Sequence, residues 1–202
     1  MNSRERFLIV SGPTREPIDP VRFLSNYSTG TMGKYLAQAA KRRGYKVTWI
    51  QCPKDAPTAL LLRKQLRSLL PRHDVLIMAA AVCDVRPVSF SSSKIKKENL
   101  LVLRLVKNPD ILADLAKRKR KDQIFIGFGL ESSRLIEEGR RKLKEKGLEL
   151  IVLQNVTRRA NPFGDKAIRA VLLDRHGVVE NFPSISKRSL AGWLIRRAAE
   201  WV

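Results

Sequence analysis

RFLIVSG, residues 6–12, is a short apolar run closed by a glycine, a pattern typical of a buried parallel strand. The next periodic stretch is Gly30–Arg43, in which apolar and small residues recur at helical spacing. Gly44 follows, at a position where a left-handed residue commonly ends a helix. A buried strand followed by an amphipathic helix is the first half of an α/β unit, so this stretch sets the fold class.

The same alternation continues along the chain. Strands that alternate with helices of about 12 residues predict a parallel sheet covered on both faces. The predicted fold is α/β, with a doubly wound, mostly parallel, Rossmann-like sheet in one domain over residues 1–202. Further strands are predicted over Lys46–Ile50, Asp74–Val82, Gln123–Gly127 and Leu148–Leu153, and helices over Thr58–Leu70, Ser132–Lys146 and Ser186–Trp201.

The middle of the chain is less regular. Ser89–Asn99 is polar and predicts a mobile loop, and Leu100–Val106 predicts an edge strand. Asn108 is expected to cap a helix that has Pro109 at its first position and runs to about Lys119.

Two later segments predict a β-hairpin. Ala167–Asp174 and Val178–Phe182 are both strand-like, and Arg175-His176-Gly177 joins them. We expect this hairpin to be appended to the parallel sheet.

Composition excludes several classes of protein. No apolar run approaches the roughly 18 residues of a membrane span, and Met1–Arg6 is too polar for a signal peptide. Only 6% of the residues are aromatic, too few for a surface that stacks single-stranded nucleic acid. Cys52 and Cys83 form no CxxC motif, which favours a reduced, cytoplasmic setting.

The charge points to anionic partners. The chain has 40 Lys and Arg against 19 Asp and Glu, a formal net charge of +21. Such a balance suits either nucleic acid or ligands that carry several phosphates. A nucleic-acid-binding module stays open as the alternative, although the sequence shows neither a groove-entering helix nor an aromatic platform. The short basic clusters at Lys41–Arg43 and Lys117–Lys121 are equally explained as solvated helix ends.

Familiar catalytic and nucleotide motifs are missing from the sequence. No GxGxxG follows the first strand, which disfavours a nicotinamide-dependent oxidoreductase, and Gly30–Tyr35 fails the GxxxxGK[ST] spacing of a phosphate loop. His73 and His176 are isolated, and no residue set suggests a metal site or a protein nucleophile. A long segment between the first strand and the glycine-opened helix remains, and the free N–H groups of that helix favour an anion.

The expected ligand site lies beyond the carboxyl ends of the strands, as in other open α/β sheets. Small or polar residues stand at these ends, as a pocket for a nucleotide would require. They are Ser11–Thr14, Ala80–Asp84, Gly127–Leu130 and Gln154–Val156.

Several blocks of the sequence closely resemble the phosphopantothenoylcysteine synthetase (phosphopantothenate–cysteine ligase) family, in particular the ligase half of the bacterial bifunctional enzyme. The blocks stand in the family's order and cover nearly the whole chain. They are Gly12–Gly33 (GPTREPIDPVRFLSNYSTGTMG), Ala79–Pro87 (AAAVCDVRP), Lys94–Lys97 (KIKK), Lys107–Leu112 (KNPDIL) and Gly127-Phe128.

The resemblance implies a ligase that works in two half-reactions. The carboxylate of 4′-phosphopantothenate attacks the α-phosphate of CTP, and the cysteine amino group then displaces CMP from the acyl-cytidylate. It also implies Mg²⁺ with the nucleotide phosphates, small-molecule substrates rather than nucleic acid, and a homodimer. Positioning and electrostatics can supply most of this catalysis, which fits a site without a protein nucleophile.

The resemblance also assigns a nucleotide site. Lys94 would close over the phosphates as a catalytic residue, although a solvated lysine is the plain alternative. Lys142 and Lys146 would leave one helix face together; otherwise they pair with Glu138 and Glu145. The nucleotide-binding residues are Asp84, Lys94, Pro109, Asp110, Ile111, Leu112, Phe128, Lys142 and Lys146.

For phosphopantothenate, the resemblance assigns Arg22, Asn26 and Ala80, with Asn26 also catalytic in handling the acyl-nucleotide. Asn26 is otherwise a turn residue. The chain departs from the family pattern at Thr31, Gly129 and Gln154, positions that bear on fine substrate and base preference; Lys34 is the candidate replacement for the lysine lost at position 31.

Overall fold

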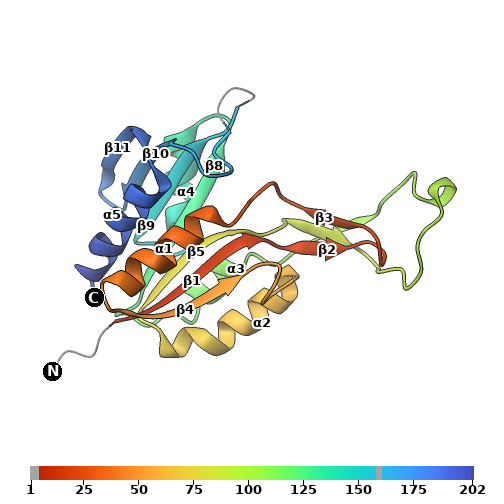
Figure 1. Cartoon of the computed structure of the whole chain (residues 1–202), viewed down its shortest axis with the longest axis horizontal. Coiled ribbons are helices and arrows are strands. Elements are labelled where there is room, and N and C mark those ends of the chain that lie inside the picture. The colour runs from red at the N-terminus through yellow and green to blue at the C-terminus, as the bar shows by residue number, and fades with distance from the viewer. Residues whose placement is uncertain (1–4, 158–160) are drawn as a thin grey trace.

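The computed structural model describes residues 5–157 and 161–202, and these form a seven-stranded sheet (Figure 1). Five strands are parallel and two are antiparallel. The strand order is β11-β10-β9-β8-β5-β1-β4. The bounds are β1 (Arg6–Pro13), β4 (Lys46–Gln51), β5 (Val75–Ala81), β8 (Ile124–Glu131), β9 (Leu150–Asn155), β10 (Ile168–Asp174) and β11 (Gly177–Ile185).

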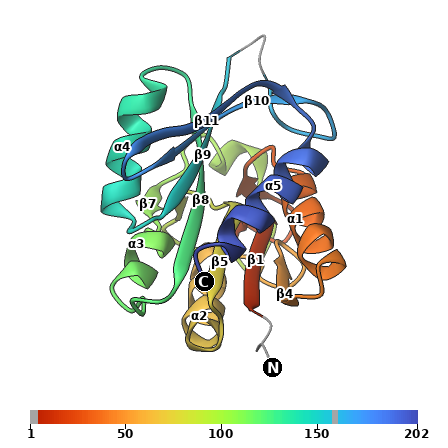
Figure 2. The ribbon, with the colours of Figure 1, turned by 90° about the vertical axis from the view of Figure 1, so that its left-hand side faces the viewer.

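Helices cover both faces of the sheet (Figure 2), and each face has its own apolar cluster. Helices α1 (Thr31–Arg42) and α5 (Lys187–Ala199) pack side by side on one face. Helices α2 (Ala59–Leu69), α3 (Ile111–Ala116) and α4 (Leu135–Glu145) cover the other. The doubly wound α/β prediction is therefore confirmed. None of the helices in the described ranges has the length and apolar character that a membrane crossing requires.

The predicted hairpin is also confirmed, but it is hydrogen-bonded to the main sheet instead of being only appended to it. β10 and β11 pair with each other, and β10 also pairs with β9 through Leu153–Val171, Val152–Leu172 and Ile151–Leu173. The hairpin thus extends the main sheet as its antiparallel edge.

Two predictions for the middle of the chain are wrong. Instead of an edge strand over Leu100–Val106, the structure has β7 (Leu105–Lys107), which pairs with β6 (Val85–Pro87) away from the main sheet. The following helix is shorter than predicted, and its cap is Asp110, which accepts from the backbone N–H of Ala113 at 3.1 Å.

Asn108 does not cap that helix because its side chain is used elsewhere. Its Nδ2 donates to the carbonyl of Cys83 at 2.8 Å, and its Oδ1 accepts from Arg86 at 3.0 Å. These bonds tie the chain before α3 to the segment after β5.

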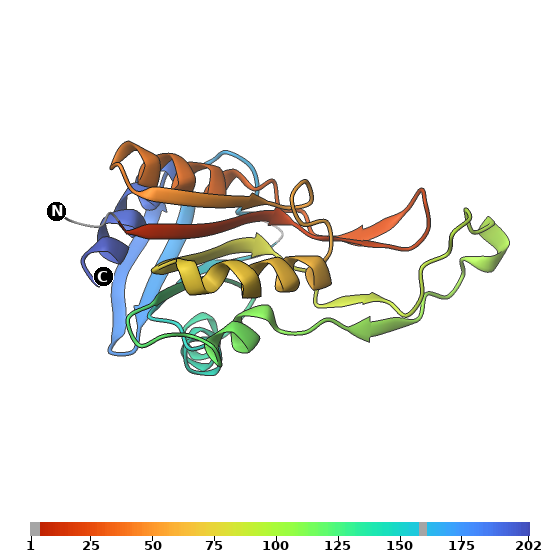
Figure 3. The ribbon, with the colours of Figure 1, turned by 90° about the horizontal axis from the view of Figure 1, so that it is seen from below.

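A long arm projects from the sheet beyond the carboxyl ends of the strands (Figures 1 and 3). We use "the arm" for residues 15–25 and 85–107. It holds two small ribbons that the sequence did not reveal, β2 (Arg15–Pro17) with β3 (Phe23–Ser25) and β6 with β7, and the short 3₁₀ helix η2 (Lys97–Asn99). Its exposed apolar side chains are Val21, Phe23, Val88, Phe90, Leu101, Val102, Leu103, Leu105 and Val106.

Helix α1 packs unusually closely on β1. A Cβ at Gly33 would lie 2.1 Å from Cβ of Ser11, so only glycine fits there. Gly30, the N-cap of α1, has a φ of 74°, which also favours glycine. The start of α1 is therefore fixed against the carboxyl end of β1.

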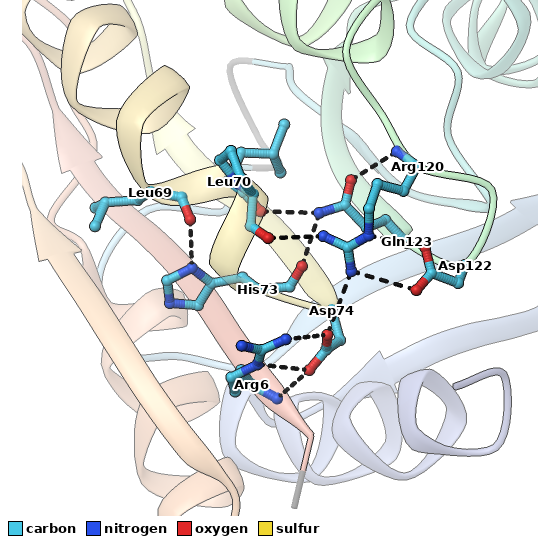
Figure 4. A network of polar contacts seen from close by, with 9 residues as sticks. Arg6, Leu69, Leu70, His73, Asp74, Arg120, Asp122 and Gln123 are labelled. Carbon is cyan, nitrogen blue, oxygen red and sulfur yellow. Dashed lines mark hydrogen bonds and ion pairs between the residues drawn. The ribbon is translucent and has the colours of Figure 1, made fainter. Parts of the chain in front are cut away.

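The opposite end of the sheet carries a network of polar contacts (Figure 4). Asp74 accepts from the backbone and guanidinium of Arg6 at 2.9–3.2 Å. Buried Gln123 donates to the carbonyls of Leu70 and His73 at 2.8 and 2.7 Å. Leu70 belongs to the 3₁₀ helix η1 (Leu70–Arg72), which links α2 to β5. The first strand begins, and the last helix ends, at this amino end (Figure 1).

Candidate functional site

A cavity of about 390 Å³ opens at the carboxyl ends of β5, β8 and β9. The start of α1 forms one side, and the segment at Pro162-Phe163 with the start of α5 forms another. We call it the first cavity. Its walls include Asn26, Thr29–Met32, Ala79–Val82, Asp84, Phe128–Leu130, Lys142, Gln154 and Lys187.

A second cavity of about 210 Å³ adjoins the first, because Ala80, Val82, Asp84 and Phe128 line both. Its other walls come from the segment 108–112 and from Lys146. The position of both cavities agrees with the rule that ligands of open α/β sheets lie beyond the carboxyl ends of the strands. Of the residues assigned by resemblance, these two cavities bring together Asn26, Ala80, Asp84, Pro109, Asp110, Ile111, Leu112, Phe128, Lys142 and Lys146.

The start of α1 offers a binding surface for an anion. Gly30 stands at the N-cap, and the first turn carries no acidic side chain. The hydroxyl groups of Thr29 and Thr31 share a hydrogen bond of 2.7 Å at the cavity wall. The N-terminal N–H groups of a helix attract negative charge. Lys34 is exposed and lines neither cavity.

The start of α3 differs from that of α1. Asp110 caps it and adds a negative charge. The carboxylate of Asp110 also accepts from Lys146 Nζ at 3.0 Å. The second cavity is therefore lined by an ion pair rather than by unpaired N–H groups alone.

Asn26 connects the arm to the floor of the first cavity. Its Nδ2 donates to the carbonyl of Ala81 at 3.1 Å and contacts Sγ of Cys83 at 3.9 Å. Cys83 is buried, and burial raises the pKa of its thiol. The amide of Asn26 is thus held at the end of β5, where its remaining polar atoms can reach a ligand.

Lys142 and Lys146 face different cavities, and each contacts a carboxylate. Lys142 Nζ forms an ion pair with Glu131 at the end of β8. Neither lysine takes the partners considered from the sequence, since Arg141 binds both Glu138 and Glu145. The two ammonium groups therefore do not converge on one point in this structure.

Lys94 and Arg22 lie on the arm and line neither cavity. Lys94 is exposed in the segment between β6 and η2. The guanidinium of Arg22 donates to Asp19 at 2.7 Å and to the carbonyl of Ile95 at 3.1 Å, which joins the two halves of the arm. Both residues are thus separated from the cavities that hold the other assigned residues.

Sequence reasoning missed several residues of the first cavity, above all Lys187. It lies in the first turn of α5, and only 6% of its surface is exposed. A lysine directly after a serine cap is a detectable signal, because a cation is disfavoured at the positive end of a helix. Phe163, whose ring is tilted against that of Tyr27 with centroids 6.3 Å apart, was also not anticipated.

Comparison with a protein-family model places the chain. Residues 2–202 match the family described as the C-terminal domain of the DNA/pantothenate metabolism flavoprotein. The chain belongs to this family.

Individual relatives agree with this placement. The Coenzyme A biosynthesis bifunctional protein CoaBC of Borreliella burgdorferi is 35% identical over 206 residues, which is 95% of this chain and 52% of that protein. A protein named Cysteine/Cysteine sulfinic acid decarboxylase, from an unknown prokaryotic organism, is 36% identical over 98% of this chain and 58% of its own length. The chain therefore spans a little over half the length of these relatives.

The fold agrees with a solved member of the family. The crystal structure of the C-terminal domain of CoaBC superposes with a TM-score of 0.77 at 28% identity, over 96% of this chain and 93% of that one. The chain thus has the fold of the CoaBC C-terminal domain.

Proposed function

We propose that this member of the DNA/pantothenate metabolism flavoprotein C-terminal domain family is a phosphopantothenate–cysteine ligase that uses CTP. The observation that carries the proposal is the pair of adjoining cavities, because residues from four separate sequence blocks line them. A ligase that activates its substrate with a nucleotide needs room for two anionic ligands side by side. Similarity to a coenzyme A biosynthesis protein supports the same reaction.

The chemistry has two steps. A carboxylate oxygen of 4′-phosphopantothenate attacks the α-phosphorus of CTP, and the bond to the β-phosphate breaks to release pyrophosphate. The nitrogen of cysteine then attacks the acyl carbon, loses a proton, and displaces CMP. The protein's task is to align these groups and to stabilise negative charge as it builds on the phosphate oxygens.

Each wall of the cavities suits one part of this task. The N–H groups at the start of α1 would receive phosphate oxygens. Asp84 and Phe128, which line both cavities, would hold the ribose and base. Asn26, anchored on Ala81, would orient the acyl-cytidylate by hydrogen bonding without adding charge.

Mg²⁺ would be bound mainly by the nucleotide. Residues 5–157 and 161–202 contain no group of three or more His, Cys, Asp and Glu side chains placed to hold a metal ion. Bound to the nucleotide, Mg²⁺ would neutralise charge on the triphosphate.

The direct test is product analysis by mass spectrometry. The protein is incubated with 4′-phosphopantothenate, cysteine and Mg²⁺, and with CTP, ATP, GTP or UTP in turn. We expect phosphopantothenoylcysteine, CMP and pyrophosphate, with the fastest turnover for CTP. Equal or faster turnover with ATP would contradict the choice of CTP, and no product with any nucleotide would overturn the ligase proposal.

We also propose that the working form is a homodimer joined through the arm. The arm presents apolar side chains to solvent, including Phe90 at 55% and Leu101 at 86% exposure. Apolar surface of this kind marks an interaction site. The arm also carries Lys94 and Arg22 away from the cavities of their own chain. A second copy is the partner that makes both facts consistent, because it would receive these basic residues in its own site.

Co-expression of two inactive variants tests this arrangement. Lys94→Gln and Lys142→Met are each expected to lose most activity. If Lys94 serves the neighbouring copy, mixed dimers contain one intact site, and a random mixture recovers about a quarter of the wild-type activity. Absence of recovery in mixed dimers that are shown to form would place Lys94 in the site of its own chain.

A further inference from the structure

Lys187 is a buried cation on the wall of the first cavity. Its side chain comes from the first turn of α5, which packs beside α1 (Figure 2). The residue is 6% exposed, and Nζ donates to the carbonyl of Gly164. The same cavity is lined by Gly30 and Thr31 at the start of α1. Two helix N-termini and one ammonium group therefore meet at this wall.

The surroundings of Lys187 are unfavourable for a positive charge. Burial lowers the pKa of its ammonium group, and nearby Lys166 lowers it further, while Asp165 acts in the opposite direction. Asp165 is itself engaged by the hydroxyl of Tyr35 at 2.7 Å. The positive end of α5 adds a further electrostatic cost.

A second lysine on the wall of the first cavity has a carboxylate partner. Lys142, on the same cavity, is neutralised by Glu131. Within the described ranges, no carboxylate oxygen lies at ion-pair distance from Lys187, and the carbonyl of Gly164 takes one of its three N–H donors. Buried lysines are normally paired, so a buried lysine that faces a cavity with donors to spare suits an anionic ligand.

We propose that Lys187 binds a phosphate group of a substrate in the first cavity, together with the N–H groups at the start of α1. This inference rests on the proposed ligase function and adds a binding residue to it. The phosphate belongs either to the nucleotide or to 4′-phosphopantothenate. Both ligands offer the same chemistry, a phosphate group with one or two negative charges whose oxygens accept several hydrogen bonds.

The test compares binding of phosphorylated and unphosphorylated ligands. Lys187→Met keeps the length of the apolar stem and removes the charge, and Arg188→Gln removes an exposed charge from the next residue as the matched control. Dissociation constants are measured by calorimetry for CTP against cytidine and for 4′-phosphopantothenate against pantothenate. We expect Lys187→Met to weaken one phosphorylated ligand at least tenfold, with its unphosphorylated counterpart and the other pair changed less than about twofold. The ligand that loses affinity identifies the source of the phosphate.

Thermal unfolding separates this role from a structural one. Replacing a buried, unpaired charge by an apolar side chain of similar shape is commonly neutral or stabilising. We therefore expect the unfolding midpoint of Lys187→Met to stay within about 2 °C of the wild type or to rise. Lys187→Gln provides the same binding comparison if the methionine variant does not fold. A lowered midpoint with equal loss of phosphorylated and unphosphorylated ligands would show that Lys187 only fastens Gly164, and unchanged binding would also overturn the inference.

Failure of the proposed function would look different. If the wild-type protein binds neither CTP nor 4′-phosphopantothenate, the ligase proposal fails and the phosphate assignment fails with it. If the wild type binds both and the Lys187 variants bind them equally well, the ligase proposal stands and only the role of Lys187 is rejected.

Discussion

The two ends of the sheet use polar side chains in opposite ways. At the amino end, the carboxylate of Asp74 is bound by Arg6 and Arg120, and Gln123 satisfies two carbonyls of the turn before β5 (Figure 4). At the carboxyl end, α1 begins behind a glycine, and Lys187 faces the first cavity while its Nζ donates to the carbonyl of Gly164.

This difference separates stability from function. Polar groups that the protein itself satisfies contribute to the free energy of unfolding. Polar groups directed at a cavity contribute to the binding free energy when a ligand is bound. Without the ligand they add little to the free energy of unfolding or even lower it. Changes at the amino end should therefore alter stability, and changes at the carboxyl end or on the arm should alter catalysis.

The largest effect is expected for Lys94→Gln. If Lys94 contacts a phosphate in the transition state, losing its charge slows pyrophosphate release by about 10²–10³. Because the side chain is exposed, the unfolding midpoint should not change. Lys96→Gln, an exposed neighbour on the same segment, is the control. Normal pyrophosphate release by Lys94→Gln would mean that Lys94 is only a solvated lysine.

Asn26→Asp should slow the second half-reaction more than the first, by about 10². The variant keeps the size of the side chain but places a negative charge beside the phosphate anhydride and loses the bond to the carbonyl of Ala81. Rapid quenching followed by mass spectrometry should show that the acyl-cytidylate accumulates. A folded variant that forms neither intermediate nor product would place Asn26 in binding or in the first step.

Asp74→Ala tests the other end of the comparison. Losing its bonds to Arg6 and Arg120 should lower the free energy of unfolding by about 1–2 kcal/mol, with kcat/KM unchanged within about twofold. Asp122→Ala, which removes an exposed carboxylate that also contacts Arg120, should change stability by less than about 0.5 kcal/mol. If Asp74→Ala lost activity without losing stability, the assignment of stability to the amino end of the sheet and of function to its carboxyl end would be contradicted.

The smallest effect concerns His73 and pH. Burial lowers the pKa of this imidazole, whose ring nitrogens contact the carbonyl of Leu69 at 2.8 Å and the hydroxyl of Thr48 at 2.7 Å. At pH values between the folded and unfolded pKa of His73, the unfolded chain binds more protons than the folded one. The contribution of neutral His73 to the free energy of unfolding is therefore present above about pH 6.5 and is lost as the pH falls below it. Denaturant unfolding measures the free energy of unfolding at pH 7.5 and at pH 5.5. We expect this free energy to fall between the two pH values in the wild type, and to fall by up to about 1 kcal/mol less in His73→Gln. An identical decrease in both proteins would exclude this role for His73.

Most of the sheet could be predicted because its strands are continuous apolar runs and its helices show clear periodicity. The arm could not, since each strand of its ribbons is only three residues long, too short to show either a period or an apolar run. The shortened α3 was missed because Asn108 and Asp110 are both good capping residues, and tertiary bonds to Cys83 and Arg86 decide between them.

The position of the site could be predicted from the sequence, but the pairing of its side chains could not. Sequence blocks that end strands located the cavities, because parallel strands finish at one edge. The separation of Lys142 from Lys146 depends on Glu131 and Asp110, which come from other elements and have no fixed spacing to them. Lys187 stands far along the chain from the other blocks; its place after a serine cap marks it as unusual, but its position on the cavity wall follows from the packing of α5 beside α1.

The position of the chain ends has a practical meaning for longer relatives. The first strand starts beside Asp74, and Trp201 lies near Gln123, so both ends of the described chain leave the sheet opposite the cavities. The CoaBC relatives carry roughly as much chain again. A second module attached at either end would lie at the amino end of the strands, and the cavities at the carboxyl end would stay accessible to ligands. The same geometry makes either terminus a suitable handle for immobilising the protein in binding experiments.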